Sequence, residues 1–285
     1  MKISAVIVLY NPVIEEIILN IRSYLLVEKI YVIDNSEEKN SHIQKILKEE
    51  SCKIEYIANK ENLGIAKALN IACQQAIIDG YEWILTMDQD SQFLNFTHFL
   101  SCAKKIIHQE KDIAIITPNH SHLTMPDTKG CDYIDKKEIV ITSGNLVNLQ
   151  IYQEINGYEE EFFIDMVDYD FCLKILEKNY KILFLSNHYI LHELGTIYKR
   201  KNLITQKVKE KIEHPPLRIY YNTRNTLYLI TKHKSVPFLK TINILFIHEI
   251  TKIVLYEDQK IKKIYAKLLA LKDFIIGRKG KIESL

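Results

Sequence analysis

The sequence of 285 residues contains no glycine-rich loop of the kinds that hold nucleotide phosphates. It has only 8 glycines and 6 prolines, its first glycine is Gly64, and neither G-x-G-x-x-G nor G-x-x-x-x-G-K-S/T occurs. These absences exclude a dinucleotide-binding domain and a P-loop. Any phosphate that the protein binds must therefore be neutralised by other groups, such as a metal ion or arginine side chains.

Long hydrophobic runs are absent as well. The first apolar run, residues 3–9, is too short for the core of a secretion signal and is typical of a strand. The longest apolar stretch near the C-terminus is interrupted by His248, Glu249 and Lys252, so it falls short of the roughly 18 to 20 residues that cross a bilayer. We therefore expect a protein that neither leaves the cell nor spans a membrane.

The five cysteines are odd in number and form no C-x-x-C pair. This pattern argues against a disulfide framework and a zinc ribbon, and it favours the reducing cytoplasm. The content of 47% hydrophobic and 26% charged residues also excludes collagen-like and disordered chains. The sequence therefore predicts a globular cytoplasmic protein.

Charge is unevenly distributed along the chain. Residues 1–231 carry 26 Lys and Arg against 31 Asp and Glu, whereas residues 232–285 carry 12 against 5. The acidic body argues against nucleic acid as a partner. The basic tail contains one apolar stripe at helical spacing, formed by Ile261, Ile264, Tyr265, Leu268 and Leu271. Such a helix is typical of a membrane-surface element, and a core-packed helix with a solvated lysine face is the alternative.

Hydrophobic periodicity predicts alternating strands and helices in the first part of the chain. Apolar runs typical of strands cover residues 3–9, 29–33, 54–58 and 83–87, and helical patterns cover 14–25, 43–50 and 65–79. This alternation predicts an α/β fold with a mostly parallel central sheet flanked by helices. Further short strands, at 113–117, 139–143 and 182–185, indicate a mixed sheet, and the pattern beyond residue 200 is mostly helical.

The carboxyl ends of the expected parallel strands share one edge of the sheet, where ligands of such sheets bind. The polar segments at this edge are Tyr10-Asn11, Asp34-Asn35-Ser36, Asn59 with Asn62, and Asp88-Gln89-Asp90. The carboxylates of Asp88 and Asp90 suit a divalent cation that also binds diphosphate oxygens, and a solvated turn or helix cap is the alternative. The other segments suit a base or a ribose, with Asx turns and helix caps as the alternative.

A second acidic segment, residues 162–174, places three carboxylates among large apolar side chains. Asp165 and Asp168 stand three residues apart, so on a helix they share one face. A partly buried carboxylate in such surroundings suits a general base. Capping of a helix that begins near Asp168 is the alternative.

Two kinds of residue further along the chain suit a metal–diphosphate site. His192 can add a neutral nitrogen ligand to a metal held by Asp90, or it can cap a loop. Residues 218–225 have a helical pattern with two guanidinium groups, Arg218 and Arg224. Their fork geometry suits a diphosphate, and surface salt bridges are the alternative.

Taken in order, these segments resemble the family 2 glycosyltransferases, and most closely their bacterial rhamnosyltransferase branch. The resemblance covers about residues 3–230. It is carried by the segments 6–11, 32–36, 62–70, 87–91, 143–145, 162–168 and 192–195.

The resemblance implies a GT-A fold, a nucleotide-diphosphate sugar donor and an inverting single displacement assisted by Mg²⁺ or Mn²⁺. The implied site residues are Tyr10, Asn11, Asp34, Asn62, Lys67, Asp88 and Arg224 for the nucleotide sugar, and Asp88, Asp90 and His192 for the metal. Asp168 is the implied base. Many members have Glu-Asp at this place, whereas here Val167 precedes Asp168, so Asp165 is kept as the alternative base.

We therefore expect a transferase that moves a deoxyhexose such as L-rhamnose from a dTDP donor to a glycan or lipid-linked glycan in bacterial surface-polysaccharide synthesis. The alternatives are transfer of another hexose from a UDP donor, and a catalytically silent sugar-nucleotide-binding or scaffold protein.

The expected organisation is a catalytic domain at 1–231 and a basic helical C-terminal extension at 232–285. The domain would have a nucleotide-binding half at 1–111 and an acceptor half at 112–231. Residues 258–285 are the expected peripheral contact with the inner face of the plasma membrane.

Overall fold

The chain forms two compact units. The computed structural model describes residues 1–38, 41–121, 130–136, 138–192, 197–201, 208–283 and 285. The first unit comprises Met1–Glu159 and Asp168–Glu193, and the second comprises Glu160–Val167 and Leu194–Leu285. We expected a division after residue 231, whereas the units part near residue 193, because the helix before residue 232 packs against a helix of the C-terminal segment. A functional division at residue 231 stays a prediction.

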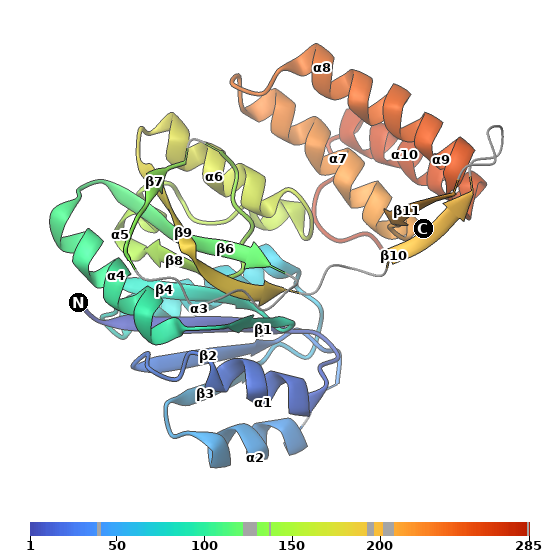
Figure 1. The fold of residues 1–285 in the computed structure, drawn as a ribbon. Coiled ribbons are helices and arrows are strands. Elements are labelled where there is room, and N and C mark those ends of the chain that lie inside the picture. The colour runs from blue at the N-terminus through green and yellow to red at the C-terminus, as the bar shows by residue number, and fades with distance from the viewer. Residues whose placement is uncertain (39–40, 122–129, 137, 193–196, 202–207, 284) are drawn as a thin grey trace. The chain divides into compact units, whose positions relative to one another are not determined.

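The first unit is built on one nine-stranded sheet (Figure 1). Its parallel part has the order β3-β2-β1-β4, formed by Ile54–Ala58, Lys29–Asp34, Ile3–Leu9 and Trp83–Asp88. The order continues β8-β6-β9-β5, formed by Asn145–Asn148, Ile113–Ser121, Lys181–His192 and Ser91–Phe93, and β7 (Ile134–Asp135) pairs with β9. Strand β8 is antiparallel to both of its neighbours, so the sheet is mixed here. The expected α/β fold is confirmed.

Helices flank this sheet (Figure 1). They are α1 (Ile14–Arg22), α2 (Ser41–Glu50), α3 (Ile65–Ile78), α4 (Phe96–Gln109), α5 (Leu149–Glu154) and α6 (Val167–Glu177). Helix α3 packs on β1, β2 and β4, and α4 packs on β6 and β9. The central strands are buried almost throughout, which explains why they are continuous apolar runs in the sequence.

One expected strand is wrong, and the expectation for the region beyond residue 200 is incomplete. Residues 139–143, all within the described ranges, form no strand. The strand of this region, β8, begins after Gly144, which turns the chain with a φ of +82°. Beyond the first unit, β10 (Ile197–Lys201) pairs with β11 (Val208–Ile212) ahead of the helices.

The cysteines also differ from expectation, because a disulfide joins Cys102 to Cys131. It links α4 to the segment that precedes β7, across 29 residues of sequence. No short motif marks this spacing, so the sequence alone gave no signal for the pair. The thiols of Cys52, Cys73 and Cys172 are free.

The second unit is mostly helical (Figure 1). Its helices are α7 (Pro216–Lys232), α8 (Phe238–Ile242), the π-helical segment η2 (Asn243–His248), α9 (Glu249–Tyr256) and α10 (Lys260–Ile275), and a 3-10 turn, η1, covers Glu160–Phe162. Its core joins α7, α10 and the inserted segment through Tyr220, Tyr221, Ala266, Ala270 and Phe163. The expected helical C-terminal extension is confirmed. Within the described ranges, no helix has both the length and the hydropathy needed to span a membrane.

Helix α10 turns two lysines toward the interior of the second unit. Lys263 is 2% exposed and donates to carboxylates of Glu213 (2.5 Å) and Glu257 (2.9 Å). Lys267 is 0% exposed and donates to Glu249 (2.6 Å). Helix α10 packs on α7, as the alternative expected, but the solvated lysine face is wrong for these two residues.

Part of the expected apolar stripe of α10 faces solvent instead. Ile261 is 85% exposed, Tyr265 55% and Leu268 58%. The ion pairs on the inner face make this orientation stable, because each buried ammonium group has a carboxylate partner.

A charged network ties the end of α3 to strand β2. Oδ2 of Asp79 accepts hydrogen bonds from Lys29 Nζ (2.7 Å) and the Tyr31 hydroxyl (2.6 Å), and Oδ1 accepts one from Gln75 (2.9 Å). The hydrogen bond from Lys29 is the largest cause of a pKa of about 2 for Asp79. This pKa is lower than the value of about 3.9 in the unfolded chain, so the carboxylate stabilises the fold above that pH, and the contribution disappears as pH falls toward the folded pKa.

We expect Asp79→Asn to lower the free energy of unfolding at neutral pH by about 1 kcal/mol, because charge-assisted bonds are lost from a side chain that solvent partly screens. The wild type should lose the same stability between about pH 4 and pH 2, and the variant should lack this pH dependence. Urea unfolding measures both, with the exposed Asp112→Asn as control. Equal stability of Asp79→Asn and wild type at neutral pH would contradict the assignment.

Candidate active site

Asp88, Asp90 and His192 converge at the carboxyl end of β4. Asp88 is the last residue of β4, Asp90 lies in the turn that follows, and His192 ends β9. Strand β5 pairs antiparallel with β9 and places Ser91 opposite His192, which brings the imidazole beside the acidic turn. One ligand atom of each of the three residues lies within 4.8 Å of the others. Two carboxylates and an imidazole at this spacing suit a divalent cation.

Charge interactions set the protonation of this cluster. Nδ1 of His192 lies 2.8 Å from Ser91 Oγ and 3.4 Å from Asp90 Oδ1. Burial raises the pKa of Asp90, but the hydrogen bond and charge of His192 outweigh burial, so this pKa falls below its usual value. Burial and the negative charges of Asp90 and Asp168 raise the pKa of Asp88 to about 6. The site therefore favours an added positive charge.

The loop before β8 supports Asp88 through its backbone. The N–H of Asp88 donates to Ser143 Oγ (3.1 Å), and the N–H of Gly144 donates to the carbonyl of Thr86 (2.7 Å). Gly144 has a φ of +82°, and a Cβ at this position would lie 2.9 Å from Cγ of Pro118. Glycine is favoured here because its φ is positive and because a Cβ would crowd Pro118 of β6 and Ile190 of β9.

Polar contacts join the ends of β1 and β2 to the acidic turn. The N–H of Tyr10 donates to Gln89 Oε1 (2.9 Å), and the Tyr10 side chain is 43% exposed. Asn11 has a φ of +46°, and its N–H donates to Ser36 Oγ (2.9 Å). The N–H of Ser36 donates in turn to Oδ1 of Asp34 (2.9 Å). The predicted residues at this edge therefore form one connected surface.

Asp34, Asn62 and Lys67 lie at the ends of neighbouring elements. Asp34 is 1% exposed, and its Oδ2 accepts a hydrogen bond from the Tyr56 hydroxyl (2.5 Å). Asn62 makes a local turn ahead of α3, because its Oδ1 accepts from the N–H of Gly64 (3.0 Å). Lys67 is exposed in the first turn of α3. Asn62 therefore forms the Asx turn that was the alternative to a role in binding a base or a ribose.

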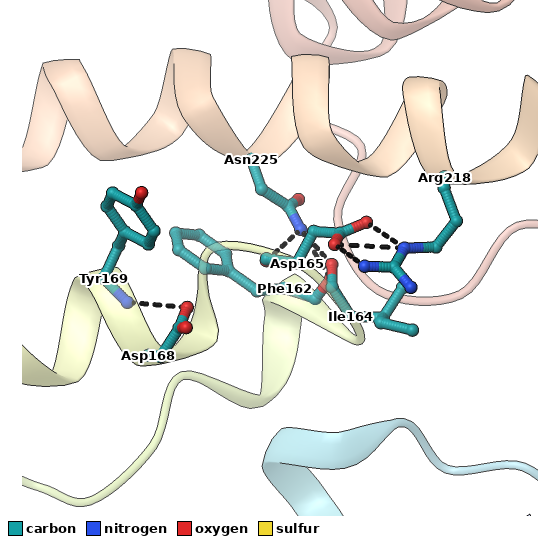
Figure 2. Close-up of polar contacts among 7 residues, drawn as sticks. All are labelled: Phe162, Ile164, Asp165, Asp168, Tyr169, Arg218 and Asn225. Atoms are coloured by element: carbon teal, nitrogen blue, oxygen red, sulfur yellow. Dashed lines mark hydrogen bonds and ion pairs between the residues drawn. The ribbon is translucent and has the colours of Figure 1, made fainter. Parts of the chain in front are cut away.

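Asp168 lies in the first turn of α6 and belongs to the same unit as the acidic turn. Its Oδ1 accepts a hydrogen bond from the N–H of Tyr169 (2.9 Å; Figure 2). The negative charge of Asp168 contributes to the raised pKa of Asp88, so the two carboxylates are close enough to interact. The charge of Asp168 therefore acts on the acidic turn, although the two segments are far apart in the sequence.

Asp165 belongs to the second unit, where Arg218 engages both of its oxygens (Figure 2). Nε of Arg218 lies 3.1 Å and 2.9 Å from Oδ1 and Oδ2, and Nη2 lies 2.5 Å from Oδ1. The amide of Asn225 donates to the carbonyls of Phe162 (2.7 Å), Ile164 (2.8 Å) and Asp165 itself (3.1 Å). The carboxylate and the backbone of this segment are thus both held from helix α7.

The structure contradicts the expected contact of Arg224 with a diphosphate. Arg224 is 0% exposed in the second unit. Its guanidinium donates to Asn225 Oδ1, the Tyr220 hydroxyl and the carbonyls of Gly280 and Glu161. These five bonds use all the donors of the side chain. Arg224 therefore organises the interior of the second unit.

Several polar groups that hold the site were missed in the sequence. Ser91 contacts His192, Gln89 bridges to the end of β1, Tyr56 fixes Asp34, and His120 Nε2 lies 2.8 Å from the Ser143 carbonyl. Gln89 and Ser91 lie within the acidic motif, so their positions carried a signal. Tyr56 and His120 gave none, because their partners are far away in the sequence.

Comparison with known proteins finds a family that this chain resembles. Residues 4–123 match the family model described as "Glycosyl transferase family 2". The chain is also 29% identical over 296 residues to the dTDP-rhamnosyl transferase RfbF of Shigella flexneri, in an alignment that covers 98% of this chain and 97% of that protein. The chain is thus similar to the family 2 glycosyltransferases over residues 4–123. Its matched region contains Asp88 and Asp90 and the ends of β1 and β2.

Solved structures show the fold of this chain. The structure of S. aureus TarS 1–349 in complex with UDP-GlcNAc has a TM-score of 0.59 and 15% sequence identity, covering 98% of this chain and 82% of that chain. The structure of GalNAc-T7 with UDP, GalNAc and Mn²⁺ has a TM-score of 0.57 and 13% identity, covering 67% of this chain. The alignment spans 44% of that longer chain. The chain has the GT-A fold.

We expect Arg224→Lys to lower the free energy of unfolding by about 2 to 4 kcal/mol, because a lysine cannot reproduce the fork and leaves buried carbonyls without donors. Urea unfolding measures this loss. The half-exposed Arg218→Lys is the control and should cost less than about 1 kcal/mol. Weaker nucleotide-sugar binding by a fully stable Arg224→Lys protein would show that the buried arrangement is not the one in solution.

Proposed function

We propose that this protein is a family 2 glycosyltransferase that moves L-rhamnose, with inversion, from a dTDP-linked donor to a glycan or lipid-linked glycan in bacterial surface-polysaccharide assembly. The observation that carries the proposal is the full-length similarity to a dTDP-rhamnosyl transferase. A hexosyltransferase that uses a UDP donor is the second candidate, because the structural neighbours hold UDP-GlcNAc or UDP.

Three side chains fit a divalent cation beside the donor diphosphate. The ligand atoms of Asp88, Asp90 and His192 lie within 4.8 Å of one another, and burial together with the negative charges of Asp90 and Asp168 raises the pKa of Asp88. Carboxylate oxygens suit Mg²⁺ and Mn²⁺, and the imidazole is compatible with Mn²⁺, which the neighbour GalNAc-T7 holds. When bound, such an ion supplies Lewis-acid stabilisation of the departing diphosphate.

The donor nucleotide would lie on the edge formed by the ends of β1 and β2 and the start of α3. Asp34 is buried and fixed by hydrogen bonds, so its carboxylate is held in one orientation. The exposed ring of Tyr10 offers a flat apolar face for a base, and exposed Lys67 offers a positive charge. Asn11 and Asn62 complete the proposed pocket with amide groups.

We assign the catalytic base to Asp168. The acceptor hydroxyl would lose its proton to this carboxylate while its oxygen attacks the anomeric carbon and the bond from that carbon to the diphosphate oxygen breaks. A single displacement of this kind inverts the anomeric centre and needs no covalent intermediate. Asp165 is less suited, because Arg218 holds both of its oxygens in an ion pair.

We expect Asp168→Asn to lower the turnover of dTDP-rhamnose on the order of 1,000-fold, because an amide cannot accept the proton. Donor affinity should stay nearly unchanged, since other residues hold the donor. Release of dTDP in the presence of Mn²⁺ and lipid-linked glycan measures turnover, and calorimetry measures binding.

Asp165→Asn is the matched comparison and should reduce turnover far less. A larger loss in Asp165→Asn than in Asp168→Asn would move the base to Asp165. Lost donor affinity in Asp168→Asn would also contradict the assignment. Faster turnover of UDP-glucose than of dTDP-rhamnose by the wild type would favour the second candidate function.

We also infer that α10 contacts the cytoplasmic face of the membrane, where a lipid-linked acceptor is found. Ile261, Tyr265 and Leu268 expose their apolar side chains, and Lys262 and Lys272 are exposed on the same helix. Apolar side chains beside basic groups are typical of helices that lie in the interface of anionic bilayers.

The double variant Ile261→Ser/Leu268→Ser should bind anionic phospholipid vesicles at least about tenfold more weakly, because two apolar side chains no longer leave water. Co-sedimentation measures this change. Ile78→Ser, which alters an equally exposed side chain of α3, should bind as the wild type does. Unchanged binding by the double variant would remove α10 as the contact.

A further inference from the structure

A second group of metal-binding side chains lies in the first unit, apart from the acidic turn. His98 and Cys102 of α4 and His188 of β9 place one ligand atom each within 4.8 Å of the others. Cys131 is bonded to Cys102, so it brings a second sulfur to the same place. None of these four side chains takes part in the proposed transfer reaction.

We propose that, in the dithiol form of the protein, His98, Cys102, Cys131 and His188 bind one Zn²⁺ ion. Structural zinc sites take four nitrogen and sulfur ligands, and two cysteines with two histidines are a common set. Cys102 and His188 are 0% and 4% exposed, so an ion here would be shielded from water. Two thiolates would balance the charge of the ion, which a buried cation requires.

The two ligands on α4 already stand at the spacing of a tetrahedral site. Sγ of Cys102 lies 3.7 Å from Nε2 of His98. A Zn–S bond of about 2.3 Å and a Zn–N bond of about 2.0 Å at a tetrahedral angle would separate the two atoms by about 3.5 Å. The residues are four apart on a helix, so they share one face without any distortion of the backbone.

An irregularity of β9 brings the third ligand to this face. The register between β6 and β9 shifts between Pro118 and Asn119, which leaves residues 186–188 of β9 as a bulge. Bulges of this kind redirect side chains. The ring of His188 stacks on that of His98 with 4.7 Å between centroids, so both imidazoles stand beside the sulfurs.

Metal binding requires that the disulfide be opened first. A thiol reductant, such as glutathione or a protein dithiol, supplies two electrons and two protons and converts the disulfide to two thiols. Zn²⁺ then displaces both thiol protons and forms two bonds to sulfur and two to neutral imidazole nitrogens. The disulfide and the ion are therefore alternative cross-links of α4, and the ion additionally ties α4 to the strand that carries His192.

Cobalt titration of the full-length protein tests the site. Protein reduced with a phosphine and freed of metal should bind one Co²⁺ with the intense charge-transfer absorption of thiolate–cobalt bonds, and equimolar Zn²⁺ should abolish that absorption. Cys131→Ser and His98→Gln should each weaken this binding on the order of 100-fold. Cys52→Ser removes an exposed thiol elsewhere and should bind as the wild type does. Asp90→Asn should also keep the thiolate absorption.

A second measurement does not depend on the folding of any variant. In the reduced wild type, Zn²⁺ should slow alkylation of Cys102 and Cys131 but not that of Cys52. Reduced wild type without thiolate–cobalt absorption would overturn the proposal, as would equal alkylation with and without Zn²⁺. Either result would leave the proposed transfer reaction untouched, because that reaction uses other residues.

Discussion

Repulsion among carboxylates at the end of a buried strand is the constraint around which the first unit is built. Asp88 and Asp90 are held close together by strand β4 and its turn, and Asp168 adds a third negative charge. Such repulsion is stronger in a medium less polar than water, so nearby positive charges or hydrogen-bond donors must stabilise the carboxylates. The imidazole of His192 lies beside the carboxylate of Asp90, and the hydrogen bond from the N–H of Asp88 to Ser143 Oγ holds Asp88 in place. The remaining deficit of positive charge is what suits this edge to the cation and the diphosphate that we propose.

The fold of the first unit was predictable from the sequence for the strands that are buried on both faces of the sheet. Strands β1 and β3 match the expected bounds, because central parallel strands are continuous apolar runs that end in polar residues. Strand β9 was underestimated, because its bulge and its polar residues disguise a strand of 12 residues. The edge of the sheet was likewise predictable from the parallel strands alone. The meeting of His192 with this edge depends on the β5–β9 pairing, which no local pattern marks.

The side-chain arrangement of the second unit could not be predicted in this way, because this unit buries charged side chains. Arg224, Lys263 and Lys267 lie inside, and each has acceptors from distant parts of the chain. A helical pattern read from sequence assigns charged residues to the solvent face, since their partners are invisible at that level. Phe163, Asp165 and Met166 add a segment with positive φ values of 64°, 63° and 63°. Such a backbone persists only where its surroundings impose it, as the three bonds from Asn225 do for this segment.

The second unit includes a short piece from the middle of the chain, and this limits how the protein can be recombined. Phe163 stacks on Tyr221 with 5.1 Å between ring centroids, and the carbonyl of Glu161 accepts the N–H of Gly280 (2.7 Å). A chimera joined near residue 193 would combine these partners from two different parents. Residues 160–167 and the C-terminal helices therefore have to diverge together, and the C-terminal helices can be transplanted into another chain only together with residues 160–167.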